Sequence, residues 1–551
     1  MTDSYPADLI ASMTQIRGAT MTDSERAIQC PRKPSYPADL VSTMTQRMCS
    51  RTGPKLRPVQ AEALYEMTGS GGLIGLIGVG HGKTLIAGLA PTLLGCSRPL
   101  VMVPAAMVKP MRVALDEYRA LGWLIPDVRL VSYSALSVES GLALLEDYAP
   151  DLIVLDEAHH LRHPEAARTR RFLRYMNAHP DTRLVALSGT LMRTSVKDFW
   201  HLSRAALGTA SPLPVTSRGL MVWSAVLDDS DVQPLPGDMY EVARAFKIPA
   251  MGWAEKREAA RTALYQHLRG SAGVVLTEGA SVDSTVKMLA ITSGLEGLDE
   301  AARAVGDSWE RPDGEELSSP LEVWRVSRQV AQGFYYRWVW PDGVPDEEWL
   351  SARKAWSAVV RARLRRGTLA DTPMLVERLI RAGSGHPHEE AALARWKGQS
   401  GAVPPVEAVW YDTSMLDVVE AWAKDGGLVW CESVAVAEAL QARGVLPVFM
   451  AGDGPPPATL PAAVVSVSSH GTGMNLQAWS RNLVLSWSSS ASVMEQLIGR
   501  THRAGQTAAE VEVWYMAHTP CLIASVVSSI EQAVYIEDTT GEPQRILHAI
   551  W

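Results

Sequence analysis

A glycine-rich loop between an apolar run and a helical pattern most constrains the fold of this chain. The loop reads Gly78-Val-Gly-His-Gly-Lys-Thr84, after the apolar run Leu73–Ile77 and before the helical pattern Leu85–Leu94. Glycines in such a loop let backbone N–H groups approach phosphate oxygens, and the N-terminus of the following helix adds positive potential. We therefore expect a strand, a phosphate-binding loop and a helix of an α/β fold.

Five residues of this loop are candidates for holding a nucleotide. Lys83 is expected to reach the β- and γ-phosphates, and Thr84 to ligate Mg²⁺. The strict phosphate-loop pattern has glycine where this chain has Ile77, and the other positions of the pattern are met. The loop therefore predicts ATP and Mg²⁺ as cofactors. The candidate residues are Gly80, His81, Gly82, Lys83 and Thr84.

Apolar runs alternate with amphipathic helical patterns in two parts of the chain. Short apolar runs bounded by turns are typical of parallel strands buried on both faces, and the helices between them imply βαβ units. In the first part we expect strands at Leu73–Ile77, Leu100–Val103, Arg129–Ser132, Leu152–Leu155 and Leu184–Leu187. In the second part we expect strands at Leu428–Cys431, Val445–Met450, Ala463–Val467, Leu483–Ser486 and Val511–Tyr515.

The 551 residues allow about three or four domains. Residues 4–15 (SYPADLIASMTQ) and 35–46 (SYPADLVSTMTQ) are a repeat. The repeat has two open interpretations: a tandem duplication or upstream start site that leaves a loose tail, or a docking helix presented twice to a protein partner. We expect an N-terminal tail at 1–50, a first α/β lobe at 51–208, a mostly helical insertion at 209–403, a second α/β lobe at 404–520 and a C-terminal extension at 521–551.

Composition excludes several classes of protein. With 47% hydrophobic and 20% charged residues, the chain has the composition of a globular protein rather than of a disordered one. The most apolar stretch, 71–95, is interrupted by His81 and Lys83, so no membrane span is expected. The net charge of −8 excludes a uniformly basic surface but not a local basic groove. Five scattered cysteines and no secretory signal favour the cytoplasm of a bacterial or phage-infected cell.

A second segment, Asp151-Leu-Ile-Val-Leu-Asp-Glu-Ala-His159, places two carboxylates at the end of an apolar strand. Asp156 can hold Mg²⁺ beside Thr84, and Glu157 can orient and polarise an attacking water. Phosphoryl transfer needs little beyond such positioned charge. This segment therefore predicts the hydrolytic half of the site.

Three further segments follow in the chain. Ser188-Gly-Thr190 comes directly after the strand at Leu184–Leu187, and Ser469-His-Gly-Thr-Gly-Met-Asn-Leu476 is a glycine-bearing loop in the second lobe. Gln496-Leu-Ile-Gly-Arg-Thr-His-Arg-Ala-Gly-Gln506 places two arginines three residues apart, so on a helix they share one face. Guanidinium groups placed in this way can grip a γ-phosphate.

In this order the segments resemble the motifs of superfamily-two helicases, and within them the Swi/Snf-type DNA translocases. The branch is indicated by the extension of Asp156–His159 into His160-Leu-Arg-His, by the long insertion and by Gly499-Arg-Thr-His-Arg-Ala-Gly-Gln506. The resemblance covers roughly 56–204 and 412–515. It implies two RecA-like, doubly wound parallel-sheet lobes with a mostly helical insertion between their motifs.

The resemblance also implies residue roles. Arg57 and Gln60 are expected to read adenine, and Pro104 and Ser132 to lie in segments that grip a nucleic-acid backbone. Residues expected to couple hydrolysis to lobe movement or to line the cleft are Ser188, Gly189, Thr190, Gly471 and Gly473. Residues expected to complete catalysis are Asp156, Glu157, Gln496, Arg500 and Arg503. The chain departs from the branch pattern at Ile77, His81 and Ser486-Trp-Ser-Ser-Ser490. These departures bear on the assignment to a subgroup and on how hydrolysis is coupled to movement, and not on the ATP site.

A basic cluster on a predicted helix is a weaker candidate for contact with nucleic acid. It contains Arg361, Arg363, Arg365 and Arg366, with Trp349 and Trp356 nearby. The cluster either follows a phosphate backbone with aromatic support or is a solvated helix face. His386-Pro-His-Glu-Glu390 lacks the partners of a metal or nuclease site.

Three functions remain open at this stage. The first is an ATP hydrolase that translocates on double-stranded DNA without obligatory unwinding. The second is a helicase that separates strands of DNA, or less favourably RNA, in replication, recombination or repair, with single-stranded DNA as its partner. The third is a binding or scaffold protein whose slow motor depends on a partner protein. The lean size and GC-rich composition suggest a bacterial or bacteriophage source.

Overall fold

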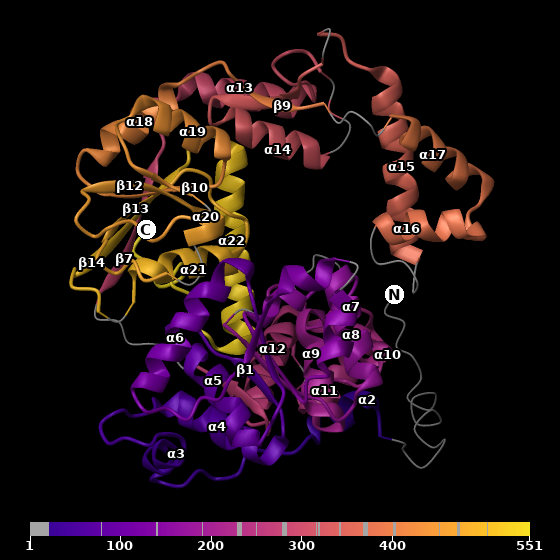
Figure 1. Ribbon diagram of the computed structural model, residues 1–551, viewed down its shortest axis with the longest axis vertical. Helices are drawn as coiled ribbons and strands as arrows, with labels where there is room; N and C mark the ends of the chain where they lie inside the picture. Colours follow the sequence, from indigo (N-terminus) through magenta and orange to yellow (C-terminus); the bar gives the residue numbers. More distant parts are fainter. Residues whose placement is uncertain are drawn as a thin grey trace, which may run out of the picture.

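The computed structural model describes residues 21–551 except 79, 139–140, 190, 229–233, 250, 278–283, 316, 318–319, 341–342, 367–372, 400–403, 451, 471–473 and 504. Its fold is mixed α/β, with two parallel sheets of six strands each. Figure 1 shows the two sheets in separate lobes, one above the other, with a long C-terminal helix reaching from one to the other. The expected α/β class with two parallel sheets is confirmed.

The first sheet has the strand order β3-β2-β4-β5-β1-β6, and all its neighbouring strands are parallel. Successive residues of a strand enter separate apolar clusters, as Leu73 and Ile74 of β1 do. Both faces of the sheet are therefore covered, as its apolar strands predict. The strands are β1 (Leu73–Leu76), β2 (Pro99–Val103), β3 (Arg129–Ser132), β4 (Leu152–Asp156), β5 (Arg183–Ser188) and β6 (Val274–Leu276).

The helices that cover this sheet complete the first lobe. The second copy of the repeated segment contributes to α3, where Leu40, Met44 and Met48 are buried against α4 and α5. This copy is therefore part of the core rather than a loose tail, and the first copy at 4–15 lies outside the described residues. The helices are α2 (Asp23–Ile28), α3 (Leu40–Met48), α4 (Pro58–Ser70), α5 (Lys83–Leu94), α6 (Val108–Ala120), α7 (Gly141–Tyr148), α8 (Ala167–Ala178), α9 (Lys197–Leu207), α10 (Ser217–Leu227), α11 (Pro236–Phe246) and α12 (Trp253–Arg269).

The second sheet has the order β11-β12-β10-β13-β14-β7 and is also parallel throughout. Together with its helices it forms the second lobe. Its strands are β7 (Thr285–Ile291), β10 (Gly427–Cys431), β11 (Val448–Phe449), β12 (Ala462–Ser466), β13 (Arg481–Val484) and β14 (Glu510–Met516). Its helices are α13 (Glu296–Ser308), α14 (Pro320–Val330), α18 (Ser414–Ala423), α19 (Val434–Arg443), α20 (Val467–His470), α21 (Ala491–Thr501) and α22 (Pro520–Thr540).

Two strands of the six-stranded sheets lie in the middle region that the sequence predicts to be mostly helical. β6 pairs with β1 in the first sheet, and β7 pairs with β14 in the second. The sheets therefore assign α10–α12 to the first lobe and β7, α13 and α14 to the second, which differs from the expected boundaries at 208 and 403. β6 has three residues and β7 is only alternately buried, so neither forms the long apolar run of a central strand.

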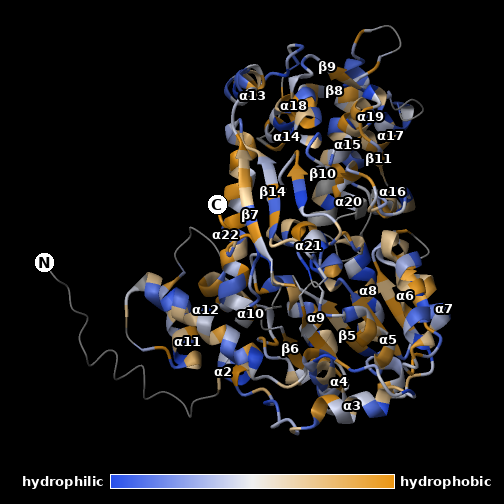
Figure 2. Cartoon of the chain, turned by 90° about the vertical axis from the view of Figure 1, so that its left-hand side faces the viewer, coloured by the Kyte–Doolittle hydropathy of each residue, from blue (hydrophilic) through white to orange (hydrophobic). Residues whose placement is uncertain are grey.

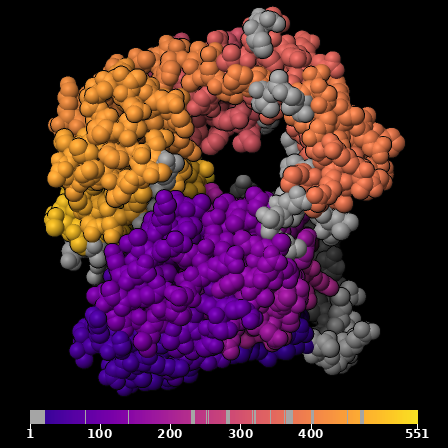
Figure 3. Space-filling model, viewed as in Figure 1, coloured from indigo at the N-terminus to yellow at the C-terminus, as the bar shows by residue number. Residues whose placement is uncertain are grey.

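The rest of the middle region is a helical arm. It begins and ends at a small antiparallel sheet of β8 (Phe334–Trp338) and β9 (Val406–Trp410). Its helices are α15 (Glu347–Arg366), α16 (Pro373–Leu379) and α17 (Pro387–Gln399), which share a small apolar core. Figure 3 shows an opening bounded by this arm, the second lobe and the first lobe.

The C-terminal helix α22 connects the lobes. It packs on α21 of the second lobe and on α12 of the first, and Tyr535 in its second half belongs to the core of the first lobe. The Arg261 guanidinium of α12 lies 5.0 Å from the centre of the Tyr535 ring. The chain then returns to the second lobe, where the Ile550 N–H donates to Val286 O at 2.9 Å. The last residues of the chain thus cross between the lobes twice.

Many apolar residues of the chain lie in the internal cores of the lobes. Figure 2 shows hydrophilic residues on outer helices such as α11 and α12, and hydrophobic residues on inner strands such as β5. Across the part of the chain that the structure describes, no helix has both the length and the apolar character needed to cross a membrane.

Candidate functional site

The glycine-rich loop lies where the sequence places it, between β1 and α5. Gly80 and Gly82 have φ of 90° and 78°, a left-handed conformation that glycine adopts without steric cost. Gly82 caps the N-terminus of α5, and Lys83 and Thr84 form its first turn. The expected order of strand, loop and helix is confirmed, and the N-terminus of α5 provides the positive potential of a helix end.

Lys83 folds back over the loop rather than pointing into solvent. Its Nζ donates to Ile77 O at 3.1 Å and Gly78 O at 3.3 Å, and it lies 3.4 Å from Glu157 Oε1. The side chain is 9% exposed. A buried ammonium group with carbonyl and carboxylate partners is suited to binding an anion, because the carbonyls can be exchanged for phosphate oxygens.

Asp156 and Glu157 lie at the carboxyl end of β4. Burial, with a contribution from Glu157, raises the pKa of Asp156 to about 7. For Glu157, burial acts to raise the pKa, but Lys83 and His159 outweigh it and hold the pKa well below its usual range. Asp156 Oδ1 is buried and has no hydrogen-bond partner among the described residues. This oxygen fits a cation ligand, because a divalent ion would offset the cost of the buried charge.

The carboxylate segment is linked to the segment after β5. His159 Nδ1 lies 3.0 Å from Ser188 Oγ and 3.3 Å from Glu157 Oε2. Gly189 is so close to the glycine-rich loop that a Cβ there would lie 2.9 Å from Gly78 Cα. The structure thus brings the first three sequence segments together, and Thr190 lies outside the described residues.

The residues upstream of α4 also reach the loop. The Arg57 guanidinium donates to Gly80 O, and Gln60 Nε2 donates to Gly82 O at 3.2 Å. Gln60 Oε1 accepts from the Arg57 N–H at 2.8 Å. Burial, followed by the charge of Lys83, lowers the pKa of His81 to about 4, so this side chain is neutral near pH 7. Arg57 and Gln60 therefore belong to the same site as the glycine-rich loop.

The second lobe contributes two arginines. Arg500 on α21 is 6% exposed, and burial lowers its pKa to about 10 although Glu157 and Asp156 oppose that shift. Arg503 lies beyond the end of α21 at Thr501, so the two arginines do not share a helix face as expected. The Arg503 guanidinium instead donates to Asn475 Oδ1.

The arginines lie close enough to the first lobe for their charges to interact with it. Glu157 and Asp156 raise the pKa of Arg500, and Arg57 lowers that of Arg503, although burial is the largest influence on both. The structure therefore places Arg500 of the second lobe within reach of the charge of the first-lobe carboxylates, and Arg503 within reach of that of Arg57.

The remaining second-lobe candidates lie around these arginines. Met474 O accepts from Arg500 Nη1 at 3.4 Å, so the described end of the glycine-bearing loop packs on the arginine pair. Gly471 and Gly473 lie outside the described residues. Gln496 is buried on α21.

The structure describes some of the residues that the sequence predicts to contact nucleic acid. Pro104 and Ser132 lie at the carboxyl ends of β2 and β3, on the same edge of the first sheet as the loop. Arg363 is not a free cation, because its Nε donates to Glu389 Oε1 at 2.8 Å. The side chains of Arg361, Arg365 and Arg366 lie outside the described residues.

The tryptophans near this cluster are core residues rather than an aromatic support. Trp349 is 2% exposed and contacts Trp338, Trp340 and Trp396, and Trp356 is buried among the arm helices. Within the described parts of the chain, no group of three His, Cys, Asp or Glu residues has the arrangement of a metal site.

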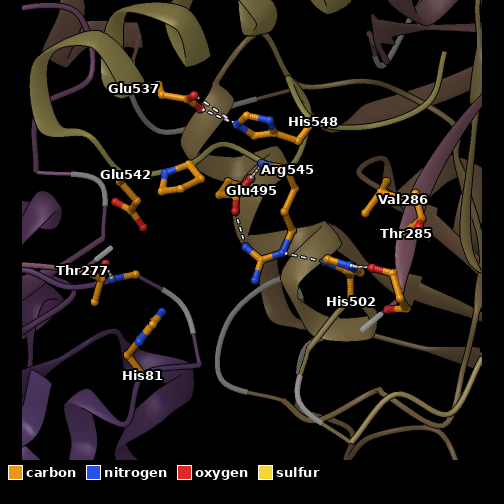
Figure 4. A pocket seen from close by; sticks show the side chains of 13 residues that line it. His81, Thr277, Thr285, Val286, Glu495, His502, Glu537, Glu542, Arg545 and His548 are labelled. Carbon is orange, nitrogen blue, oxygen red and sulfur yellow. Dashed lines mark hydrogen bonds and ion pairs between the residues drawn. The ribbon is translucent and has the colours of Figure 1, made fainter. Parts of the chain in front are cut away.

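A cavity of about 670 Å³ lies beside the loop, between the lobes. Figure 4 shows His81, Thr277 and Glu542 on one side of it and Glu495, His502 and Arg545 on the other. Sequence reasoning missed Glu542 and Arg545, because they belong to no recognisable motif. The lining residues are Gly78, His81, Thr277, Ser284, Thr285, Val286, Glu495, His502, Glu537, Glu542, Pro543, Arg545 and His548.

Comparison with protein-family models and with curated protein sequences found no match to this chain.

Proposed function

We propose that this chain is an ATP hydrolase that uses its two lobes, both RecA-like, to translocate on double-stranded DNA. The observation that carries the proposal is the meeting of two sets of charges across the lobes. Lys83, Asp156 and Glu157 come from the first lobe, and Arg500 lies within reach of their charge from the second. Division of such a set between two lobes makes the chemistry depend on how the lobes close.

The loop and its neighbours fit a magnesium-bound nucleoside triphosphate. Lys83 and the backbone of Gly80–Gly82 would hold the phosphates, while Thr84 and Asp156 would hold Mg²⁺. Arg57 and Gln60 would hold the base, which the resemblance to Swi/Snf-type translocases implies. ATP supplies the phosphoryl group, and Mg²⁺ neutralises part of its charge.

The chain's own residues account for the remaining chemistry. Glu157 stays ionised near neutral pH and can accept a hydrogen bond from the attacking water. Arg500 and Arg503 would stabilise charge that develops on the transferred phosphoryl group. His159 connects Glu157 to Ser188, so a change at Glu157 reaches the segment after β5.

The DNA part of the proposal is supported by the resemblance and by the opening beside the arm. Figure 3 shows that the opening is bounded by both lobes and the arm, so a change in their arrangement would alter the grip on a strand or duplex inside it. Contacts to the phosphate backbone are largely independent of sequence and weaken with salt.

Steady-state ATP hydrolysis tests this proposal. The wild-type chain, Lys83→Ala and the exposed control Lys424→Ala are assayed alone and with duplex DNA, single-stranded DNA or RNA, at low and moderate salt. We expect duplex DNA to stimulate hydrolysis most, and Lys83→Ala alone to reduce the rate by about 10²-fold or more, as loss of a positioned transition-state cation does.

Two other outcomes point to different functions. Stimulation mainly by single strands favours a strand-separating helicase. A rate that depends neither on Lys83 nor on any nucleic acid contradicts an autonomous motor and favours a partner-dependent scaffold.

A further inference from the structure

The segment that follows α22 places a carboxyl group against the glycine-rich loop. Gly541, with φ of 66°, turns the chain at the end of the helix. The next residue, Glu542, points its Oε1 to within 2.5 Å of the position that a Cβ on Gly78 would take, and to within 3.0 Å of that position on Gly189. The absence of side chains at these two glycines therefore makes the room that Glu542 occupies.

This carboxyl group is deeply buried, and one of its oxygens lacks a hydrogen-bond partner within the described part of the chain. Glu542 is 7% exposed, and its Oε2 is buried without a hydrogen-bond partner among the described residues. The backbone around it is held in place, because its N–H donates to Thr540 Oγ1 at 3.2 Å and its carbonyl accepts from Gln544 Nε2 at 3.0 Å. A buried polar atom without a partner costs stability, so this placement calls for a role beyond packing.

The same segment is attached to the second lobe three residues later. The Arg545 N–H donates to Glu495 Oε2 at 2.8 Å, and its guanidinium also pairs with Glu495. Its Nε lies 3.1 Å from His502 Nδ1. Glu495 and Arg500 both belong to α21, so the segment contacts the helix that carries the candidate catalytic arginine.

We propose that residues 541–545 form an autoinhibitory latch across the cleft, with Glu542 as its end at the phosphate loop and Arg545 as its anchor on α21. This inference rests on the proposed ATP site. In the latched state, the Glu542 side chain occupies space beside Gly78 and so opposes the entry of nucleotide phosphates there. Movement of the segment away from the loop removes this obstacle, and the anchor at Glu495 links that movement to α21.

The contact itself is tested by a double-mutant cycle in urea unfolding. Gly78→Ala adds a methyl group where Glu542 Oε1 lies, so it should destabilise the wild-type chain. In the Glu542→Ala background this clash is absent, and the same substitution should have much less effect. Additive effects of the two substitutions would overturn the latch, because they would show that Glu542 does not occupy this space.

The inhibitory role is tested by equilibrium binding of magnesium–ATP. Wild type, Glu542→Gln and Glu542→Ala are compared with Glu531→Gln, which removes an exposed carboxylate from the outer side of α22. We expect Glu542→Ala to bind about tenfold more tightly than wild type, which corresponds to about 1.4 kcal/mol of removed opposition. Glu542→Gln should show a smaller gain because it keeps the bulk, and Glu531→Gln should show none.

The outcomes separate the latch from the function on which it rests. Lys83-dependent binding that is unchanged or weaker in both Glu542 variants overturns the latch and leaves the ATP site standing. If no variant binds nucleotide although the double-mutant cycle shows that residues 78 and 542 are coupled, the proposed ATP site is contradicted. The latch is then contradicted with it.

Discussion

The substitution Arg500→Ala tests whether the positive charge of this α21 residue assists phosphoryl transfer at the first-lobe site. The guanidinium is buried, and its Nη1 donates to Met474 O at 3.4 Å. Burial lowers its pKa to about 10, and the charges of Glu157 and Asp156 only partly oppose this effect. A cation desolvated to this degree contributes little to folding, so its loss should affect turnover more than stability.

The magnitude follows from the role assigned to Arg500. An arginine that stabilises phosphoryl-transfer charge changes kcat by about 10³-fold or more, and a 10³-fold loss corresponds to about 4 kcal/mol. Because this charge develops in the transition state, KM for ATP should change by less than about threefold. The free energy of unfolding should change by less than about 2 kcal/mol, because relief of desolvation offsets the lost attraction to Glu157.

The assay is ATP hydrolysis with saturating duplex DNA, with urea unfolding of the same proteins. Arg500→Lys should recover little of the rate, because an ammonium group lacks the planar fork of guanidinium. Arg443→Ala is the matched control, since Arg443 pairs with Asp417 on the surface of the second lobe. An unchanged kcat, or a loss of activity fully explained by unfolding, would refute the reasoning.

Three further predictions follow from buried groups and backbone geometry. The pKa of Glu542 rises from 4.5 to about 8 on folding, chiefly through burial, so the folded chain binds more protons between these values and loses stability as the pH rises. Relative to Glu542→Gln, wild type should lose about 2–4 kcal/mol across this range in urea unfolding, and parallel curves would contradict the burial of this acid. Gly82→Ala should cost about 1–2 kcal/mol and abolish nucleotide binding, because φ is 78° and a Cβ would lie 2.3 Å from Gln60 Nε2. Gly444→Ala, with φ of 68° and open space around it, should cost stability alone, and equal nucleotide binding by both variants would count against the site. Met44→Ala should lower the free energy of unfolding by about 2–4 kcal/mol, whereas the exposed Gln46→Ala should change it by less than about 0.5 kcal/mol. Similar stability of these two variants would show that the second repeat copy is not core.

The central strands of both sheets could be predicted from the sequence because burial on both faces requires continuous apolar residues. The strand predicted at Leu152–Leu155 illustrates this, since all five residues of β4, which ends at Asp156, are buried. β6 and β7 could not be found in the same way. β6 has only three residues, and β7 at a sheet edge reads as an alternating pattern within a helical region.

The site could be predicted in part because each motif lies at the end of a recognisable strand or on a helix. Predictions from spacing along the chain were wrong where contacts between distant segments decide the position of a side chain. Arg503 lies past the end of α21, and Arg363 pairs with Glu389 from a different helix. Glu542 reaches Gly78 through the path of α22, and no local pattern in the sequence encodes a contact between residues so far apart.

Displacement of a third strand from a DNA triplex tests the central claim most directly, because it measures movement along a duplex without requiring strand separation. The wild-type chain, Lys83→Ala and Arg500→Ala are incubated with a triplex joined to a length of duplex, with and without ATP. We expect displacement that needs ATP, occurs only with the wild-type chain and is faster when flanking duplex is present. ATP hydrolysis stimulated by duplex DNA but without displacement would contradict translocation.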